Sequence, residues 1–146
     1  ASARSNRNAK GLMQILDSTA GDMIRSARLP HGNLFDPKTN IAVGEAYVRY
    51  LAVEAMKKAE LAPFEGPCKL VVRVYCEVPQ SWSKKKRAAA ETQQIAPGRP
   101  DLDNYVKISD AMIGVVFKDD VQIVAIEAAK RFGQTPCMEV EVHAQN

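Results

Sequence analysis

Several features are scarce or missing in this 146-residue chain, and each absence excludes a class of protein. No apolar run approaches the ~20 residues that a membrane span requires, and no charged-then-apolar secretory segment opens the sequence. The three cysteines, Cys68, Cys76 and Cys137, are odd in number and lack C-x-x-C spacing, which argues against a disulfide framework and against a zinc site. We therefore expect a globular protein of the reducing cytoplasm, without a membrane partner.

The net charge of +3 is modest, but the charges are unevenly distributed. Residues 1–100 carry 16 Lys and Arg against 9 Asp and Glu, a net +7, whereas residues 101–146 carry 4 against 8, a net −4. A basic body with an acidic C-terminal third suits a protein that holds a polyanion and places carboxylates against it. An uneven surface charge without any charged partner would give the same numbers. Charge alone therefore favours nucleic-acid binding and its absence about equally.

The expected helices follow from caps and periodicity. Residues 1–34 are predicted to form a basic arm or irregular segment. The short apolar run Leu12–Leu16 within it suits either a strand or the start of a helix. Apolar residues at three- and four-residue spacing predict a helix after Asn40, taken as its N-cap, that ends before Pro63. Ser83 is expected to cap a second, short helix. A third is predicted over residues 104–112, ended by Gly114.

The expected strands follow from alternation. Residues 70–78 alternate apolar and polar side chains, which predicts a half-buried strand. Further strands are predicted over residues 121–128 and 138–142. Because these two are close in sequence, they are expected to form a hairpin.

The densest group of chemically versatile residues lies between Arg99 and Gln122. Pro100 favours an extended conformation for Arg99. If the chain stays extended, Asp101 and Asp103, two residues apart, project to one side, and Lys107 follows one helical turn later. Asp119 and Asp120 start the next predicted strand, so their side chains are expected to diverge. Carboxylates held together repel one another, and a divalent cation resolves the conflict. An all-oxygen ligand set suits Mg²⁺ or Mn²⁺, and a nearby lysine can stabilise charge on a phosphate oxygen.

Structural alternatives stand beside this hypothesis. An Asp-x-Asp pair at a helix start is often only a cap, and an Asp-Asp pair before a strand is often only a turn. The Lys84–Arg87 run is typical of a solvated helix face, although part of it could contact phosphate. Trp82 is interpreted as a core anchor in preference to a base-stacking side chain.

The sequence resembles the RusA family of Holliday junction resolvases, which are phage- and prophage-borne enzymes. Three blocks carry the resemblance, in order and spacing: Val78-Pro79-Gln80-Ser81-Trp82-Ser83-Lys84-Lys85-Lys86-Arg87, Arg99-Pro100-Asp101-Leu102-Asp103-Asn104 with Lys107, and Lys118-Asp119-Asp120-Val121-Gln122-Ile123-Val124 with the later Lys130. It covers roughly residues 35–142. We take residues 35–146 as one RusA-like endonuclease domain that follows the arm.

The resemblance implies a homodimer of the α/β class, α+β in type, in which a mixed β-sheet packs against helices. It implies binding of branched DNA and, with Mg²⁺ or Mn²⁺, paired symmetric nicks that leave 5′-phosphates. The family's essential acids match Asp101, Asp103 and Asp120, with Asp119 as an alternative metal ligand, and its essential lysine matches Lys107. Basic residues expected to contact the DNA are Arg25, Arg28, Lys84, Lys85, Lys86, Arg87, Arg99 and Lys130.

One spacing departs from the family pattern. An aspartate usually follows the essential lysine by four residues, but Asp110 follows Lys107 by three. A missing residue in an α-helix predicts a rotation of about 100°, unless the helix adjusts locally. Two alternatives therefore remain open: a DNA-binding protein with an impaired active site, and a metal-dependent phosphohydrolase that acts on small nucleotides or RNA.

Overall fold

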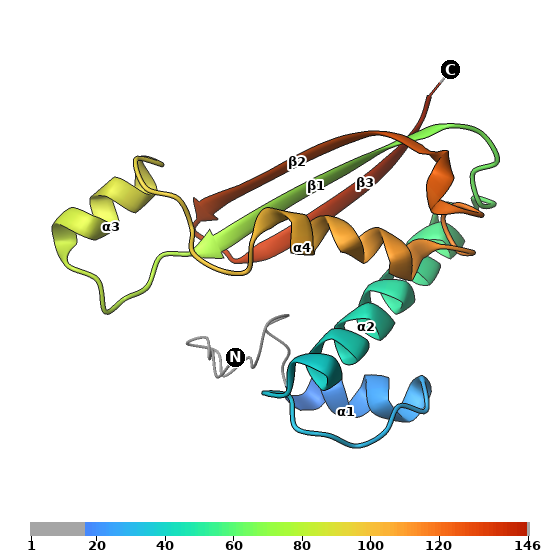
Figure 1. The fold of residues 1–146 in the computed structure, drawn as a ribbon, viewed down its shortest axis with the longest axis horizontal. Helices are drawn as coiled ribbons and strands as arrows, with labels where there is room; N and C mark the ends of the chain where they lie inside the picture. The colour runs from blue at the N-terminus through green and yellow to red at the C-terminus, as the bar shows by residue number, and fades with distance from the viewer. Residues whose placement is uncertain (1–16, 146) are drawn as a thin grey trace. The chain divides into compact units, whose positions relative to one another are not determined.

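Residues 17–145 are described by a computed structural model, shown in Figure 1. The chain divides into two units, the first made of Ala1–Pro63 with Asp110–Phe117 and the second of Phe64–Ser109 with Lys118–Asn146. The boundary expected at residue 34 falls inside the first unit. Within the described residues, no helix is both long enough and apolar enough to cross a membrane.

The first unit contains two helices, α1 (Asp17–Ser26) and α2 (Pro37–Lys58). They bury a small apolar cluster between them, made of Ala20, Met23, Ile24, Leu34 and Val43. Helix α1 lies in the stretch that was expected to be irregular. Its few apolar side chains give only a weak sequence pattern, since they are buried by packing against α2. Residues 1–16 of the predicted arm lie outside the described residues.

The predicted N-cap of α2 is wrong. The helix begins four residues earlier, where Asp36 is the N-cap and its carboxylate accepts the Thr39 N–H at 2.9 Å. Pro37 follows at the first helical position, which its fixed φ favours. Asn40 is instead buried inside the helix, and its amide donates to the Leu34 carbonyl at 3.0 Å. The expected end before Pro63 is confirmed, since α2 ends at Lys58.

The sheet of the second unit has three strands in the order β2-β1-β3, namely β1 (Cys68–Glu77), β2 (Ile123–Gly133) and β3 (Cys137–Ala144). Strand β1 pairs parallel with β2 and antiparallel with β3, so the sheet is mixed and the predicted α+β class is confirmed. The predicted β2–β3 hairpin is wrong, because β1 lies between them. Leu70, Val71 and Val72 are buried in succession, as is typical of a central strand covered on both faces.

The connection between the parallel strands carries α3 (Lys84–Glu91) and α4 (Leu102–Val106), and α4 continues into a 3₁₀ helix, η1 (Lys107–Met112). A parallel pair needs such a crossover. The Ser83 cap is confirmed, since its hydroxyl accepts the Lys86 N–H at 3.3 Å. A third helix is present as predicted, but it is α-helical only over its first five residues.

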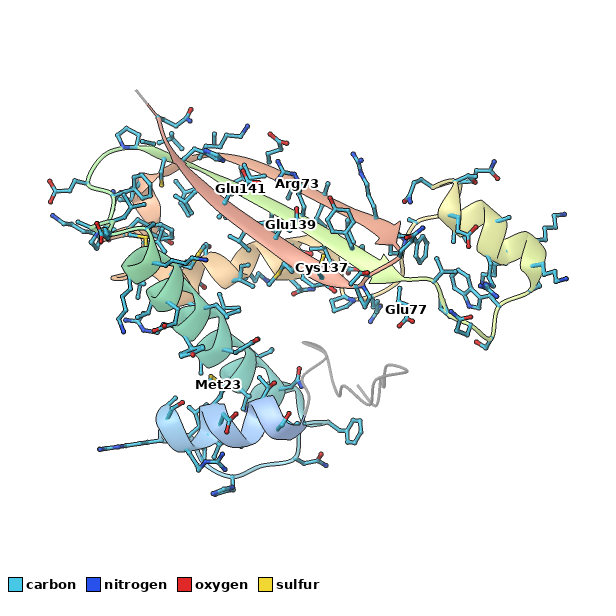
Figure 2. All side chains as sticks on the ribbon, turned by 180° about the vertical axis from the view of Figure 1, so that it is seen from behind. Met23, Arg73, Glu77, Cys137, Glu139 and Glu141 are labelled. Atoms are coloured by element: carbon cyan, nitrogen blue, oxygen red, sulfur yellow. The ribbon has the colours of Figure 1, made fainter. Side chains whose placement is uncertain are left out.

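The two faces of the sheet differ in chemistry. Helix α4 contacts β1 and β2 on the side of Lys130, whose side chain reaches the loop that leads into α4. Side chains on the opposite face form ion pairs, in which Arg73 and His143 both bond Glu141 and Lys69 bonds Glu127; Figure 2 shows Arg73 with Glu139 and Glu141 along the strands. Helix α4 therefore lies on the face of Lys130, and the opposite face carries these ion pairs.

Candidate active site

Asp101 lies at the N-cap position of α4, yet its carboxylate does not cap the helix. Its backbone is extended, and its side chain makes no capping hydrogen bond. The first turn closes through the backbone instead, since the Asn104 N–H donates to the Asp101 carbonyl at 3.1 Å. A role as a helix cap, the alternative considered for this aspartate, therefore does not explain its exposed carboxylate.

Asp103 and Lys107 lie on the same exposed side of α4. The Lys107 ammonium is 4.0 Å from the Asp103 carboxylate, across one helical turn. An ion pair between two such exposed side chains adds little to stability. The pair presents a cation and an anion side by side to solvent.

The short spacing after Lys107 coincides with a change of helix type. The backbone is α-helical to Val106 and 3₁₀ from Lys107. A 3₁₀ helix has three residues per turn, so the three-residue step to Asp110 completes one turn. A 3₁₀ turn therefore suits the three-residue spacing between Lys107 and Asp110. Lys107 itself lies one helical turn after Asp103.

The second acidic block forms a 3₁₀ turn, η2 (Asp120–Gln122), and not the start of a strand as expected. Asp119 is its N-cap and accepts the Val121 N–H at 3.0 Å. That bond, followed by a hydrogen bond with the Asp120 side chain, lowers the pKa of Asp119. The two side chains therefore meet, and the expected divergence is wrong because the turn brings them to one side. Asp119 has a structural role as a cap, which leaves Asp120 as the better match to the family's acid.

Gln122 fixes this turn through both ends of its side-chain amide. The oxygen accepts the backbone N–H groups of Lys118 and Asp119 at 2.7 and 3.0 Å. The nitrogen donates to the carbonyls of Phe64 and Gly66, both at 2.9 Å. Sequence reasoning gave Gln122 no role. Its spacing from Asp119 is that of a capping box, a signal that could have identified it.

The two acidic blocks are anchored at different points along β2. The loop before Asp101 is bonded to Lys130, which pairs with Val74, whereas η2 precedes Ile123, which pairs with Cys68. The two pairs are six positions apart along β1, or about 20 Å of strand. Among residues 17–145, no group of three or more His, Cys, Asp or Glu side chains is close enough to hold a metal ion. The structure thus brings Asp103 and Lys107 together, but does not gather Asp101, Asp103 and Asp120 into one cluster.

The carboxylates at the start of α4 can still supply the protein's share of a magnesium site. Mg²⁺ is commonly held by one or two carboxylates, with waters and substrate phosphates completing its shell. Asp101 and Asp103 are both exposed, and their oxygens are the hard ligands that this ion prefers. The donor chemistry at α4 therefore fits the cation that the sequence predicted.

Tyr105 anchors the inner face of the same helix. It is half-buried, and desolvation, with a smaller effect from Cys76 of β1, raises the pKa of its phenol to about 12. The phenol is therefore neutral at physiological pH. Burying Tyr105 fixes the rotation of α4, which directs Asp103 and Lys107 towards solvent.

The basic run on α3 is only partly available to a ligand. Lys86 places its ammonium 3.8 Å above the Trp82 ring, a cation–π contact, and Trp82 packs edge-on against the buried Phe132. Arg87 is half-buried, with a buried Nε that has no hydrogen-bond partner. Lys84 and Lys85 are exposed. The contact with Phe132 is in keeping with Trp82 as a core anchor.

The remaining predicted DNA-binding residues have different surroundings. Arg99 is exposed in the loop before α4. Lys130 is half-buried and donates hydrogen bonds to that loop. In the first unit, Arg25 pairs with Asp22 at 2.5 Å on α1, and Arg28 follows that helix with a positive φ of 53°.

Comparison with known proteins assigns the family. Residues 25–143 match the family model described as Endodeoxyribonuclease RusA. An uncharacterised protein of Bacillus subtilis (strain 168), YqaN, is 32% identical over 129 residues, covering 84% of this chain and 90% of that protein. No solved structure gives a significant match.

Two other relatives are much longer proteins. Membrane-bound lytic murein transglycosylase C of Photorhabdus laumondii is 31% identical over 110 residues, which span 66% of this chain and 29% of that enzyme. Membrane-bound lytic murein transglycosylase E of Buchnera aphidicola is 43% identical over 54 residues, which span 34% of this chain and 24% of that enzyme. The chain thus covers less than a third of either transglycosylase. The family model, by contrast, spans most of this chain, and the protein belongs to the RusA family of endodeoxyribonucleases.

Proposed function

We propose that this protein resolves four-way DNA junctions by paired, symmetric, Mg²⁺-dependent nicks that leave 5′-phosphates. Membership of the RusA family supports endonuclease activity on Holliday junctions. The observation that carries the finer proposal is the exposed Asp103–Lys107 pair on α4, beside an Asp101 carboxylate that takes no part in capping.

The chemistry assigns a role to each of these side chains. Asp101 and Asp103 would hold Mg²⁺, for which Mn²⁺ could substitute. Asp120 of η2 stays the third predicted ligand, although within the described residues it forms no group with these two acids. When bound, the ion supplies Lewis-acid stabilisation of the scissile phosphate and makes an attacking water more acidic. Lys107 offsets negative charge that develops on the phosphate oxygens. Because Lys107 is beside Asp103, one phosphate can contact both the lysine and the ion.

Recognition of the branched substrate depends on dimerisation and on basic side chains. A two-fold symmetric homodimer places two equivalent sites against strands of like polarity, which gives paired nicks. Exposed basic residues away from the acids, chiefly Lys84 and Lys85 on α3 and Arg99 before α4, contact backbone phosphates. Such contacts weaken as salt rises, because binding releases counterions from the DNA.

The deciding experiment compares a synthetic four-way junction with a linear duplex of the same arm sequence. We expect paired nicks in the junction and none in the duplex. The nicks should form with Mg²⁺ or Mn²⁺ but not in EDTA, and a DNA ligase should be able to reseal them. Tight junction binding without nicks under any divalent ion would contradict the enzymatic proposal and indicate a junction-binding protein. Equal cutting of the duplex, or turnover of small nucleotides, would contradict junction specificity.

A second candidate function, binding of murein, is favoured by the 43% identity to transglycosylase E over 54 residues. It predicts that the full chain co-sediments with purified murein sacculi. Retention in the supernatant, beside a lytic transglycosylase that pellets under the same conditions, would exclude this candidate. The result does not bear on junction cleavage, which the previous assay tests separately.

A further inference from the structure

Lys130 of β2 is bonded to the loop that carries the acidic pair. Its ammonium donates to the carbonyls of Gly98 and Pro100, each at 2.7 Å. Pro100 directly precedes Asp101, the N-cap of α4. One side chain of the sheet therefore holds the backbone immediately before the helix of the candidate active site.

The composition of this loop explains why such a side chain is needed. Pro97 and Pro100 have no backbone N–H, so neither can anchor the loop by donating a hydrogen bond. The loop keeps only the N–H groups of Gly98 and Arg99 as backbone donors, and its carbonyl oxygens require donors from elsewhere. An ammonium group supplies up to three donors, and charged donors form stronger bonds than neutral ones. Lys130 meets that requirement at two carbonyls.

The surroundings of Lys130 argue against a phosphate contact. The residue is half-buried. Burial raises the pKa of the Cys76 thiol on the neighbouring strand, and the positive charge of Lys130 partly offsets that increase. Turning the ammonium out to a DNA phosphate would break both loop bonds. The part-buried Pro100 carbonyl would then lose its charged donor, and leaving a buried acceptor unpaired is costly.

We infer that Lys130 is a positioning residue that fixes the Gly98–Pro100 loop and thereby the orientation of Asp101, and that it is not a DNA contact. This role rests on the proposed function and assigns a task to a basic position whose role the sequence left open. A displaced Asp101 weakens the hold on the metal ion, and loss of an outer residue that orients a ligand typically costs 10- to 100-fold in metal affinity or activity.

The test compares Lys130→Met, Lys130→Arg and Lys85→Met. Lys85 is an exposed lysine on α3 and serves as the matched phosphate contact. Amide hydrogen exchange is measured without DNA or metal, junction binding is measured against salt concentration in EDTA, and cleavage is measured against Mg²⁺ concentration. The first two readouts do not require an active enzyme.

Lys130→Met is expected to speed exchange of the Asn104 and Lys107 amides, which donate to the Asp101 and Asp103 carbonyls, about 10-fold or more. It should raise the Mg²⁺ concentration for half-maximal cleavage about 10- to 100-fold. The salt dependence of its junction binding should match that of the unaltered protein. Lys130→Arg, which keeps the charged donors, should restore much of the protection. Lys85→Met should lower the slope of log affinity against log salt by about one, with no change in exchange or Mg²⁺ requirement.

A lower salt slope for Lys130→Met, with unchanged exchange of those amides, would overturn the inference and make Lys130 a phosphate contact. If that variant does not fold, as judged by circular dichroism, Lys130→Gln keeps one donor and is tested in the same way. Should the unaltered protein cut no junction, the proposed function fails, while the exchange data still decide whether Lys130 holds the loop.

Discussion

Asp103→Asn is expected to reduce junction cleavage by at least ~10²-fold, while junction binding persists. Removing one electrostatic group from an active site typically has an effect of this size. Asparagine keeps the size of the side chain and lacks the charge that holds a cation. It also removes the partner of the Lys107 ammonium, which lies 4.0 Å away. Single-turnover cleavage with saturating protein separates this loss from any change in affinity.

A suitable control is Glu139→Gln, which removes one negative charge from the opposite face of the sheet, where Glu139 lies beside Arg73 (Figure 2). It should cut junctions at the unaltered rate. Cleavage retained by Asp103→Asn, or lost equally in both variants, would show that Asp103 does not act at the reacting phosphate. Binding lost with cleavage would place Asp103 in substrate recognition instead.

Leu70→Ala is expected to lower the free energy of unfolding by about 2–5 kcal/mol, the usual cost of truncating a buried leucine. Leu70 is completely buried in the central strand β1, so the truncation leaves a cavity that the strands on either side cannot close. Urea denaturation followed by circular dichroism measures the change. Cleavage per folded molecule should be unaffected, since the substitution does not touch the acidic blocks.

The matched control is Ile126→Ala. Ile126 pairs with Leu70 in the sheet but is 54% exposed on the edge strand β2. Removing exposed apolar atoms costs much less, so the change should stay below about 1 kcal/mol. Equal losses in the two variants would indicate that Ile126 is covered in solution, and would contradict the assignment of β1 as the strand that carries the core.

Much of the fold could be predicted where one local pattern decides the structure. The alternation over residues 70–78 predicts β1 because one face of that strand is buried from Cys68 to Val74. Ser83 predicts the start of α3 because a hydroxyl in that position can accept an N–H of the first turn. Both signals depend on neighbouring residues alone, which is why the sequence is sufficient to read them.

The predictions failed where distant residues or competing local signals decide. The expected hairpin assumed that strands close in sequence pair with each other, but the buried run of β1 takes both partners. The cap predicted at Asn40 is wrong because Asp36, followed by a proline suited to the first helical position, caps the helix instead. Helix α1 was missed because its cluster with α2 exists only in three dimensions.

The sequence predicted the chemically active residues of the candidate site but not the residues that support them. Residue types and spacing were enough to select Asp101, Asp103 and Lys107, and the structure brings the last two together. The supporting side chains were not predicted, because Gln122 and Lys130 act through backbone carbonyls that only the folded chain brings near them. Whether the acids bind a metal stays a prediction, which the cleavage and exchange experiments address.

The central place of β1 also bears on how the chain reaches its native state. Cys68 pairs with Ile123 in one neighbouring strand and with Ala144 in the other, separations of 55 and 76 residues. No pairing in this sheet closes a short loop, so ordering β1 requires remote segments to meet before any ladder stabilises it. Chains dominated by such non-local pairings fold slowly, on the millisecond to second scale. An apolar strand without its native partners can pair with strands of other chains. During synthesis β1 is therefore exposed to aggregation until β2 and β3 have emerged from the ribosome.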